Sequence, residues 1–273
     1  MPRIPRSWLN LVVFIYPDKT KALGDQNGGG TGFFVARQVE KGWQSFIVTN
    51  RHVIDKLQNP VIRLNQIGTE EPDLCITNRL RWIDHPDGDD LSVYPLDFNT
   101  ASHRHAFIGE SGFSSLENQH LGLGSEVVML GRFVGLSGQP EVRPVARFGH
   151  IAHPEIFVET NSFNAAQETF VIECHAVPGF SGSPVLAYLP SNAANEEALE
   201  NSGVGPFLLG VIWKHFGNPE DVLDEKLQLI GAQVKGNSGL AGVIPSAKIS
   251  EILTLVDQSA SFRYPEVSQT PLA

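Results

Sequence analysis

A serine in a glycine-rich turn is the strongest chemical feature of this sequence. Residues 178–184 read Pro-Gly-Phe-Ser-Gly-Ser-Pro, with Ser181 at the centre. A serine hydroxyl becomes a nucleophile when a base takes its proton and backbone N–H groups stabilise the resulting oxyanion. Glycine at 179 lacks a Cβ, which lets the N–H groups of Gly179 and Ser181 converge. Alone, the turn is equally typical of an ordinary tight bend, so its partners decide the assignment.

Two residues of the required chemistry precede this turn in the chain. His52 follows an apolar, β-branched run and is expected at a strand end, where it can accept the serine proton and return it to a leaving amine. Asp90 immediately precedes another apolar run and can hold the imidazole in the correct tautomer. Asp89, inside the acidic turn, is its nearest competitor. These residues predict a catalytic triad of His52, Asp90 and Ser181.

The order of these three residues resembles that of the chymotrypsin-type serine peptidases. Further stretches are similar to the HtrA-type bacterial branch of that family: Gly-Thr-Gly-Phe-Phe-Val at 30–35, the run 123–131 and Ala-Gly-Val-Ile-Pro-Ser at 241–246. The resemblance extends over roughly residues 9–257 and does not include a PDZ domain. It implies an all-β fold of two six-stranded antiparallel β-barrels, with a C-terminal α-helix.

Apolar runs and turn residues place the expected elements along the chain. Residues 1–112 are expected to form the N-terminal barrel, which carries His52 and Asp90, and residues 113–257 the C-terminal barrel, which carries Ser181. Apolar side chains at i, i+3, i+4 and i+7 predict a helix over 246–257, with Ser246 as its N-cap. Residues 258–273 are expected to form a tail. The expected strands are 9–16, 31–37, 44–49, 60–65, 79–84 and 91–96 in the first barrel, and 126–131, 142–151, 155–160, 168–173, 184–188, 206–213, 228–234 and 240–244 in the second.

Composition limits the partners of the protein. Twenty basic against 30 acidic residues give a net charge of −10, which argues against nucleic acid as a partner. The longest apolar run, 11–16, is far shorter than a membrane span of about 20 residues. The two cysteines favour a reducing, cytoplasmic location. His103 and His105 lack further ligands at zinc spacing, so neither a metal nor a cofactor is expected. The polar loop 190–205 is either a flexible surface loop or a site for a regulatory partner.

The residues and the resemblance together predict a serine endopeptidase that cleaves protein or peptide substrates through an acyl-enzyme. By the resemblance, His175 lies at the base of the substrate pocket and Trp213, Lys214 and His215 form its wall, which suggests a preference for an acidic side chain. Phe180 replaces the acid that pairs with a newly cut N-terminus in digestive relatives, so that route of activation is not expected. The alternative is a catalytically silent or conditionally active domain of the same fold that binds proteins.

Overall fold

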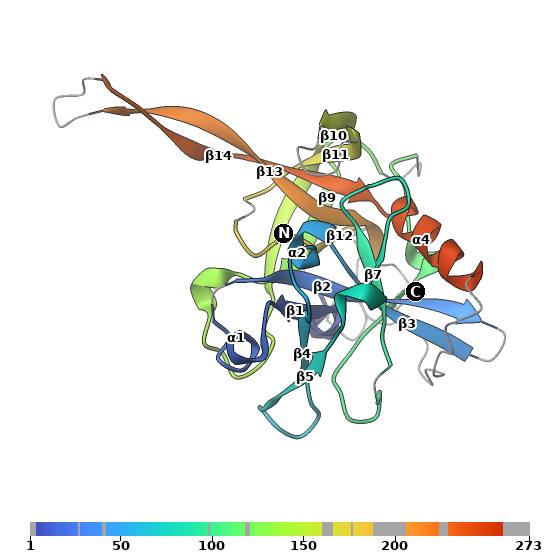
Figure 1. The fold of residues 1–273 in the computed structure, drawn as a ribbon. Coiled ribbons are helices and arrows are strands. Elements are labelled where there is room, and N and C mark those ends of the chain that lie inside the picture. The colour runs from blue at the N-terminus through green and yellow to red at the C-terminus, as the bar shows by residue number, and fades with distance from the viewer. Residues whose placement is uncertain are drawn as a thin grey trace.

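Two mainly antiparallel β-sheets form the body of the fold, and a helix follows them (Figure 1). The computed structural model describes residues 4–26, 28–39, 42–97, 99–117, 121–159, 166–175, 177–187, 206–223 and 229–258. The predicted loop 190–205 and the predicted tail beyond residue 258 lie outside these ranges. In chain order the elements are η1 (Arg6–Leu11), β1 (Val12–Tyr16), α1 (Lys19–Leu23), β2 (Gly30–Val39), β3 (Gly42–Thr49), α2 (Arg51–Ile54), β4 (Val61–Asn65), β5 (Pro72–Ile76), η2 (Arg79–Arg81), β6 (Ile83–Asp84), β7 (Ser92–Pro95), β8 (Ile108–Gly109), η3 (Glu110–Gly112), β9 (Glu126–Gly131), η4 (Val134–Leu136), β10 (Val145–Glu159), β11 (Ala166–Glu173), β12 (Pro184–Ala187), β13 (Phe207–Leu223), β14 (Leu229–Pro245) and α4 (Ala247–Gln258).

The first sheet has eight strands in the described part of the chain, not the predicted six. Its path runs β5-β4-β1-β2-β3-β7-β6, and the short β8 pairs with β2 in parallel. The sequence missed β5, an edge strand that begins at Pro72 and leaves much of its surface exposed, so it has no strong apolar pattern. The predicted strand 79–84 is a 3₁₀ turn followed by the two-residue β6.

The second sheet closes on itself in the order β10-β11-β14-β13-β12-β9. Two pairs of predicted strands are each one long strand here. The first pair forms β10, which continues through Pro154 because the register shifts between His153 and Ile156, and a bulge tolerates proline. The second pair forms β14, in which Asn237 pairs with Gly217 and Leu240 with Phe216, leaving the two residues between as a bulge rather than a turn.

A core that both sheets share holds the two halves together. Side chains of the first sheet, the second sheet and α4 belong to one buried apolar cluster, for example Val48, Val128 and Ile252. Helix α4 packs against both β7 and β14. Its predicted apolar face is confirmed, because Ile249, Ile252, Leu253 and Val256 are all buried. Ser246 precedes the helix, but its hydroxyl donates to the Ser114 carbonyl.

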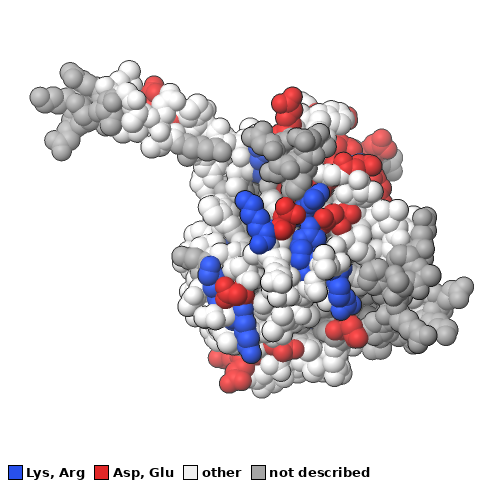
Figure 2. All heavy atoms as spheres, in the orientation of Figure 1, with Lys and Arg blue, Asp and Glu red and all other residues white. Residues whose placement is uncertain are grey.

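The outer parts of β13 and β14 leave the barrel as a long two-stranded ribbon (Figure 1). We call residues 217–223 and 229–237 the ribbon. Within it, Leu229 and Val234 are among the most exposed large apolar side chains of the described chain. Among the described residues, no helix is long and apolar enough to cross a membrane. Basic and acidic side chains are interspersed on the face shown in Figure 2, which therefore presents no continuous basic surface.

Candidate active site

His52 and Asp90, 38 positions apart in the sequence, form a close pair. His52 lies in α2, directly after β3, and Asp90 lies just before β7, which pairs with β3. The His52 Nδ1 atom lies 2.5 Å from Asp90 Oδ2, and the His52 backbone N–H donates to Asp90 Oδ1 at 2.8 Å. The Asp90 side chain is 4% exposed and that of His52 is 40% exposed. A carboxylate only accepts, so Nδ1 carries the hydrogen and Nε2 is left as a base.

Ser181 lies at the corner between two consecutive tight turns. Phe180 N–H donates to the Val177 carbonyl at 3.2 Å, with Pro178 and Gly179 as the central residues. The φ of Gly179 is +102°, which matches a type II turn with proline first and glycine second. The next turn closes when Ser183 N–H donates to the Phe180 carbonyl at 3.0 Å, and its second central residue is again a glycine with positive φ.

The three consecutive carbonyls of Gly179, Phe180 and Ser181 are each held by a hydrogen bond. Thr31, on β2, binds the turn through two hydrogen bonds. Its hydroxyl donates to the Gly179 carbonyl at 2.7 Å, and its N–H donates to the Ser181 carbonyl at 2.9 Å. The Phe180 carbonyl accepts the Ser183 N–H. Thr31 is itself fixed, because its carbonyl accepts the Thr49 hydroxyl at 2.7 Å. The first sheet therefore sets the orientation of the serine turn.

Two N–H groups of the turn are unpaired among the described residues, although those of Phe180, Gly182 and Ser183 are hydrogen-bonded. Neither Gly179 N–H nor Ser181 N–H donates to another described group. Phe180 between them is completely buried in the apolar cluster inside the barrel, so its bulk anchors the turn and does not fill the space beside Ser181. Two unpaired donors at the serine and two residues before it, with the carbonyls of residues 179–181 tied back, have the chemistry of an oxyanion hole.

The serine turn and the helix that carries His52 meet at Gly30. A Cβ placed on Gly30 would lie 3.0 Å from the Ser181 carbonyl oxygen and 2.9 Å from Val53, the residue after His52. Both Ser181 and His52 are in the described part of the chain, and no hydrogen bond joins the Ser181 hydroxyl to the imidazole. Such contacts are commonly long in a free enzyme and tighten when substrate binds.

Comparison with solved structures shows the same architecture in several proteases. The MamO protease domain from Magnetospirillum magneticum, in its apo form, is 13% identical with a TM-score of 0.52, and the match covers 94% of this chain and 99% of that chain. Deg5 is 14% identical with a TM-score of 0.52, over 92% of this chain and 90% of that chain. The HtrA-type protease AlgW, solved with a decapeptide, is 12% identical with a TM-score of 0.52, over 91% of this chain and 65% of that chain.

The chain has the fold of the HtrA-type, trypsin-like proteases. At these identities the match concerns the fold. No family model matches the chain, and no curated protein does.

Within this protease fold, the residues predicted for the substrate pocket separate into two groups. Trp213, Lys214 and His215 follow Ile212, whose carbonyl accepts Gly182 N–H at 2.9 Å, so the wall segment adjoins the serine turn. The Trp213 indole N–H donates to Thr169, and the Lys214 ammonium lies 5.4 Å from the Trp213 ring centre.

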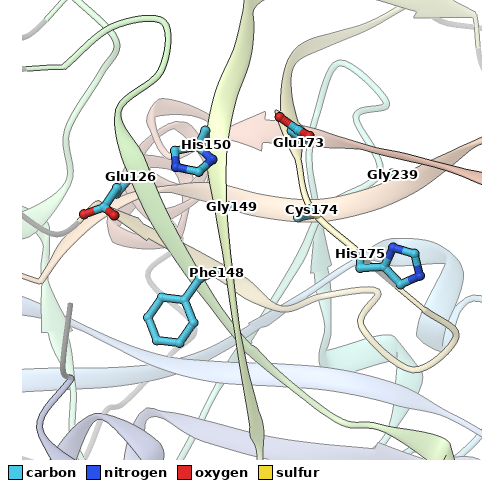
Figure 3. Close-up of a pocket in the computed structure, with 8 residues that line it drawn as sticks. All are labelled: Glu126, Phe148, Gly149, His150, Glu173, Cys174, His175 and Gly239. Atoms are coloured by element: carbon cyan, nitrogen blue, oxygen red, sulfur yellow. The ribbon is translucent and has the colours of Figure 1, made fainter. Parts of the chain in front are cut away.

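His175 is exposed and lines a different depression, of about 370 Å³ (Figure 3). The lining of that depression includes no residue of the wall segment; it consists of Glu126, Phe148, Gly149, His150, Glu173, Cys174, His175 and Gly239. The preference for an acidic side chain stays a prediction. Cys174 is a buried free thiol.

One group of described residues has metal-ligating atoms close together, namely His85, Asp87 and Glu251. A protein cation already serves this cluster, because the Lys248 ammonium lies 3.3 Å from Glu251 and 3.6 Å from Asp89. His103 and His105 are engaged elsewhere: His103 Nε2 lies 2.9 Å from Asp73, and His105 Nδ1 lies 2.8 Å from the His103 carbonyl.

Sequence reasoning missed three residues that hold the site. Thr31 stands inside the motif that carries the family resemblance, so its role could have been suspected. Asn50 is two positions before His52, and its amide donates to the Asp90 carbonyl at 3.0 Å. Gln167 accepts Asp90 N–H at 2.8 Å from the second sheet. Nothing in the local sequence marks Gln167, because its partner is 77 positions away.

Proposed function

We propose that this protein is a serine endopeptidase. His52 takes the proton of Ser181 as its hydroxyl oxygen attacks a peptide carbonyl, and the imidazolium returns that proton to the leaving amine. Asp90 fixes the tautomer of His52 and stabilises the imidazolium. The N–H groups of Gly179 and Ser181 stabilise the tetrahedral oxyanion. Water then attacks the acyl-enzyme, with His52 again as the base.

A single observation carries this proposal: the carbonyls of Gly179, Phe180 and Ser181 are tied back by hydrogen bonds and the N–H groups of Gly179 and Ser181 are unpaired among the described residues, beside a histidine paired with a buried carboxylate. Backbone donors left free at a serine can stabilise the oxyanion that its attack on a carbonyl creates. An acyl-transfer site needs this arrangement before the substrate arrives.

A peptide is the substrate class that the surroundings fit. The segment 213–216 of β13 begins at a register shift beside the serine turn, and a peptide backbone can add to such a segment as an extra strand. AlgW, which shares the fold, was solved with a decapeptide. The described residues suggest no nucleic-acid surface on the face of Figure 2.

Labelling with a fluorophosphonate probe tests the proposal. The wild-type protein should be modified at Ser181, located by mass spectrometry of the labelled peptide, and Ser181→Ala should lose labelling. Peptide hydrolysis by Ser181→Ala should fall by about a millionfold. Ser183→Ala is the matched control, because that hydroxyl is in the same turn, is buried and has no hydrogen-bond partner among the described residues.

One outcome would reverse the conclusion. A folded wild-type protein that never labels, and that hydrolyses no member of a diverse peptide library, would instead support a catalytically silent domain that binds proteins. Circular dichroism and the unfolding temperature of each variant establish that the protein under test is folded.

A further inference from the structure

The position of Asp90 depends on groups that bind its backbone. Both oxygens of its carboxylate are used by His52, and no other described side chain donates to them. The main chain is held from two sides: Gln167 accepts its N–H at 2.8 Å, and Asn50 donates to its carbonyl at 3.0 Å. These contacts set where the carboxylate can stand relative to the imidazole.

Gln167 clamps two consecutive acidic residues. It lies on β11, in the second sheet, and is 1% exposed. While its Oε1 accepts the N–H of Asp90, its Nε2 donates to Asp89 Oδ1 at 3.0 Å. The amide of glutamine supplies both an acceptor and donors, which neither an acid nor an apolar side chain of this size can do. The clamp also crosses the boundary between the two sheets.

The second oxygen of Asp89 continues the network to the C-terminal helix. His85 Nδ1 lies 3.2 Å from Asp89 Oδ2, and the Lys248 ammonium lies 3.6 Å from the same oxygen. His85, whose side chain is fully buried, reaches Glu251 with Nε2 at 2.9 Å. Lys248 and Glu251 are one turn apart on α4 and 3.3 Å from one another. Helix α4 therefore holds the acidic turn through two of its side chains.

Lys248, on α4, supplies the positive charge that balances the carboxylates around Asp89. Burial disfavours the charged form of Lys248, but the carboxylates of Asp89 and Glu251, with Glu168 nearby, outweigh burial and raise the pKa of Lys248. The ammonium thus compensates Asp89, a second buried carboxylate directly beside Asp90. Without the Lys248 ammonium, the buried Asp89 carboxylate would shift toward another cation or hydrogen-bond donor, because an unpaired buried charge is unfavourable. The acidic turn that carries Asp90 would shift with it.

We propose that Gln167 and Lys248 are positioning residues for Asp90, so that helix α4 and strand β11 keep the carboxylate aligned on His52. Neither residue touches the reacting atoms. The proposal rests on the proposed function for its kinetic consequence, while its structural consequence, the alignment of the His52–Asp90 pair, is measurable with or without turnover.

Gln167→Met is the decisive variant, because methionine keeps the length of the side chain and changes no charge. We expect kcat to fall at least tenfold with KM little changed, since misplacement of a catalytic group by about 1 Å can cost a hundredfold. A less well placed Asp90 stabilises the imidazolium of the reaction less. The acid limb of the kcat/KM profile should therefore move to lower pH, which a mere loss of folded protein would not cause.

A direct measurement separates this proposal from the proposed function. The proton shared between His52 Nδ1 and Asp90 in so short a hydrogen bond should give a far-downfield NMR signal in the wild type. In Gln167→Met it should disappear or move upfield. Gln233→Met is the matched control, because Gln233 also donates to an aspartate, Asp221 at 2.9 Å, but stands on the ribbon. An unchanged signal in Gln167→Met would overturn the positioning role, even if the wild-type protein proved inactive.

Lys248 variants keep the test decisive if Gln167→Met does not fold. Lys248→Met should weaken the NMR signal and lower kcat, whereas Lys248→Arg, which keeps the charge, should restore most of both. Lys19→Met, at an exposed position of α1, should change neither. If Lys248→Met and Lys19→Met behave alike, the helix has no part in positioning Asp90.

Discussion

At the scale of single residues, the serine turn depends on glycines that no other residue can replace. Gly182 has φ +85°, and a Cβ there would lie 2.1 Å from the Thr31 carbonyl and 2.5 Å from the Thr49 hydroxyl. Both neighbours belong to the first sheet, so the serine turn packs most closely against β2 and β3 at Gly182. The sequence predicted this glycine as a turn residue, but the close approach to the Thr31 backbone is a tertiary contact.

Gly182→Ala should therefore damage the site as well as the fold. The positive φ alone costs an alanine roughly 1–2 kcal/mol, and the clash with a backbone carbonyl adds to that cost. Gly68→Ala separates the two effects, because Gly68 has φ +81° but nothing within 4 Å of its Cβ position. We expect urea unfolding to show a clearly larger loss for Gly182→Ala, with loss of fluorophosphonate labelling. Equal losses for the two variants would mean that the turn can move away from β2.

At the scale of elements, the sequence located the strands better than it located their ends. Apolar runs predicted most of the core strands because a strand buried on both faces needs continuous apolar residues. The bulges in β10 and β14 were interpreted as turns, since the sequence features that permit a bulge, such as Pro154 and Gly239, are the same features that permit a turn. The family resemblance implied the barrel and the runs located its strands, while the unusual length of β13 and β14 was not predictable from either.

The ribbon gives a prediction that belongs to this scale. A two-stranded ribbon without a third strand or a packed face is marginally stable in water. Its backbone hydrogen bonds should therefore open far more often than those of the same two strands inside the barrel. Hydrogen exchange followed by mass spectrometry should show fast exchange in 217–223 and 229–237, and slow exchange in 207–212 and 241–245. Equal protection in both parts would indicate that another molecule covers the ribbon in solution.

At the scale of the whole molecule, polar contacts between the two sheets hold the residues of the proposed triad. His52 and Asp90 belong to the first sheet and Ser181 to the second, and the contacts of Thr31 and Gln167 cross between them. The pairing of His52 with Asp90 could be predicted because both residues have distinctive types and local surroundings. The crossing contacts could not, because each joins residues far apart in the chain, and neither a threonine nor a glutamine is unusual on a strand.

A buried cluster of charged side chains also joins the two sheets. Asp25, only 2% exposed, accepts the Tyr16 hydroxyl and the Gln139 N–H, and it lies 3.3 Å from Arg132 and 3.6 Å from Arg63. Arg63 comes from the first sheet, whereas Arg132 follows β9 of the second. Burial and the hydrogen bond to Asp25 raise the pKa of Tyr16 well above its usual value, so the phenol stays protonated as a donor.

Asp25→Asn should be among the most destabilising conservative substitutions in the protein. It keeps the shape and tolerates the φ of +43° at this position, but it leaves two buried guanidinium groups without their anion. Removing one partner from a buried ion pair typically costs about 3–5 kcal/mol. Asp18→Asn is the control, because Asp18 is the exposed N-cap of α1 and asparagine caps equally well. Urea unfolding should place the two variants several kcal/mol apart. A cost below about 1 kcal/mol for Asp25→Asn would show that the backbone carbonyls around Arg63 and Arg132 suffice, and that the sheets are joined mainly by their shared apolar core.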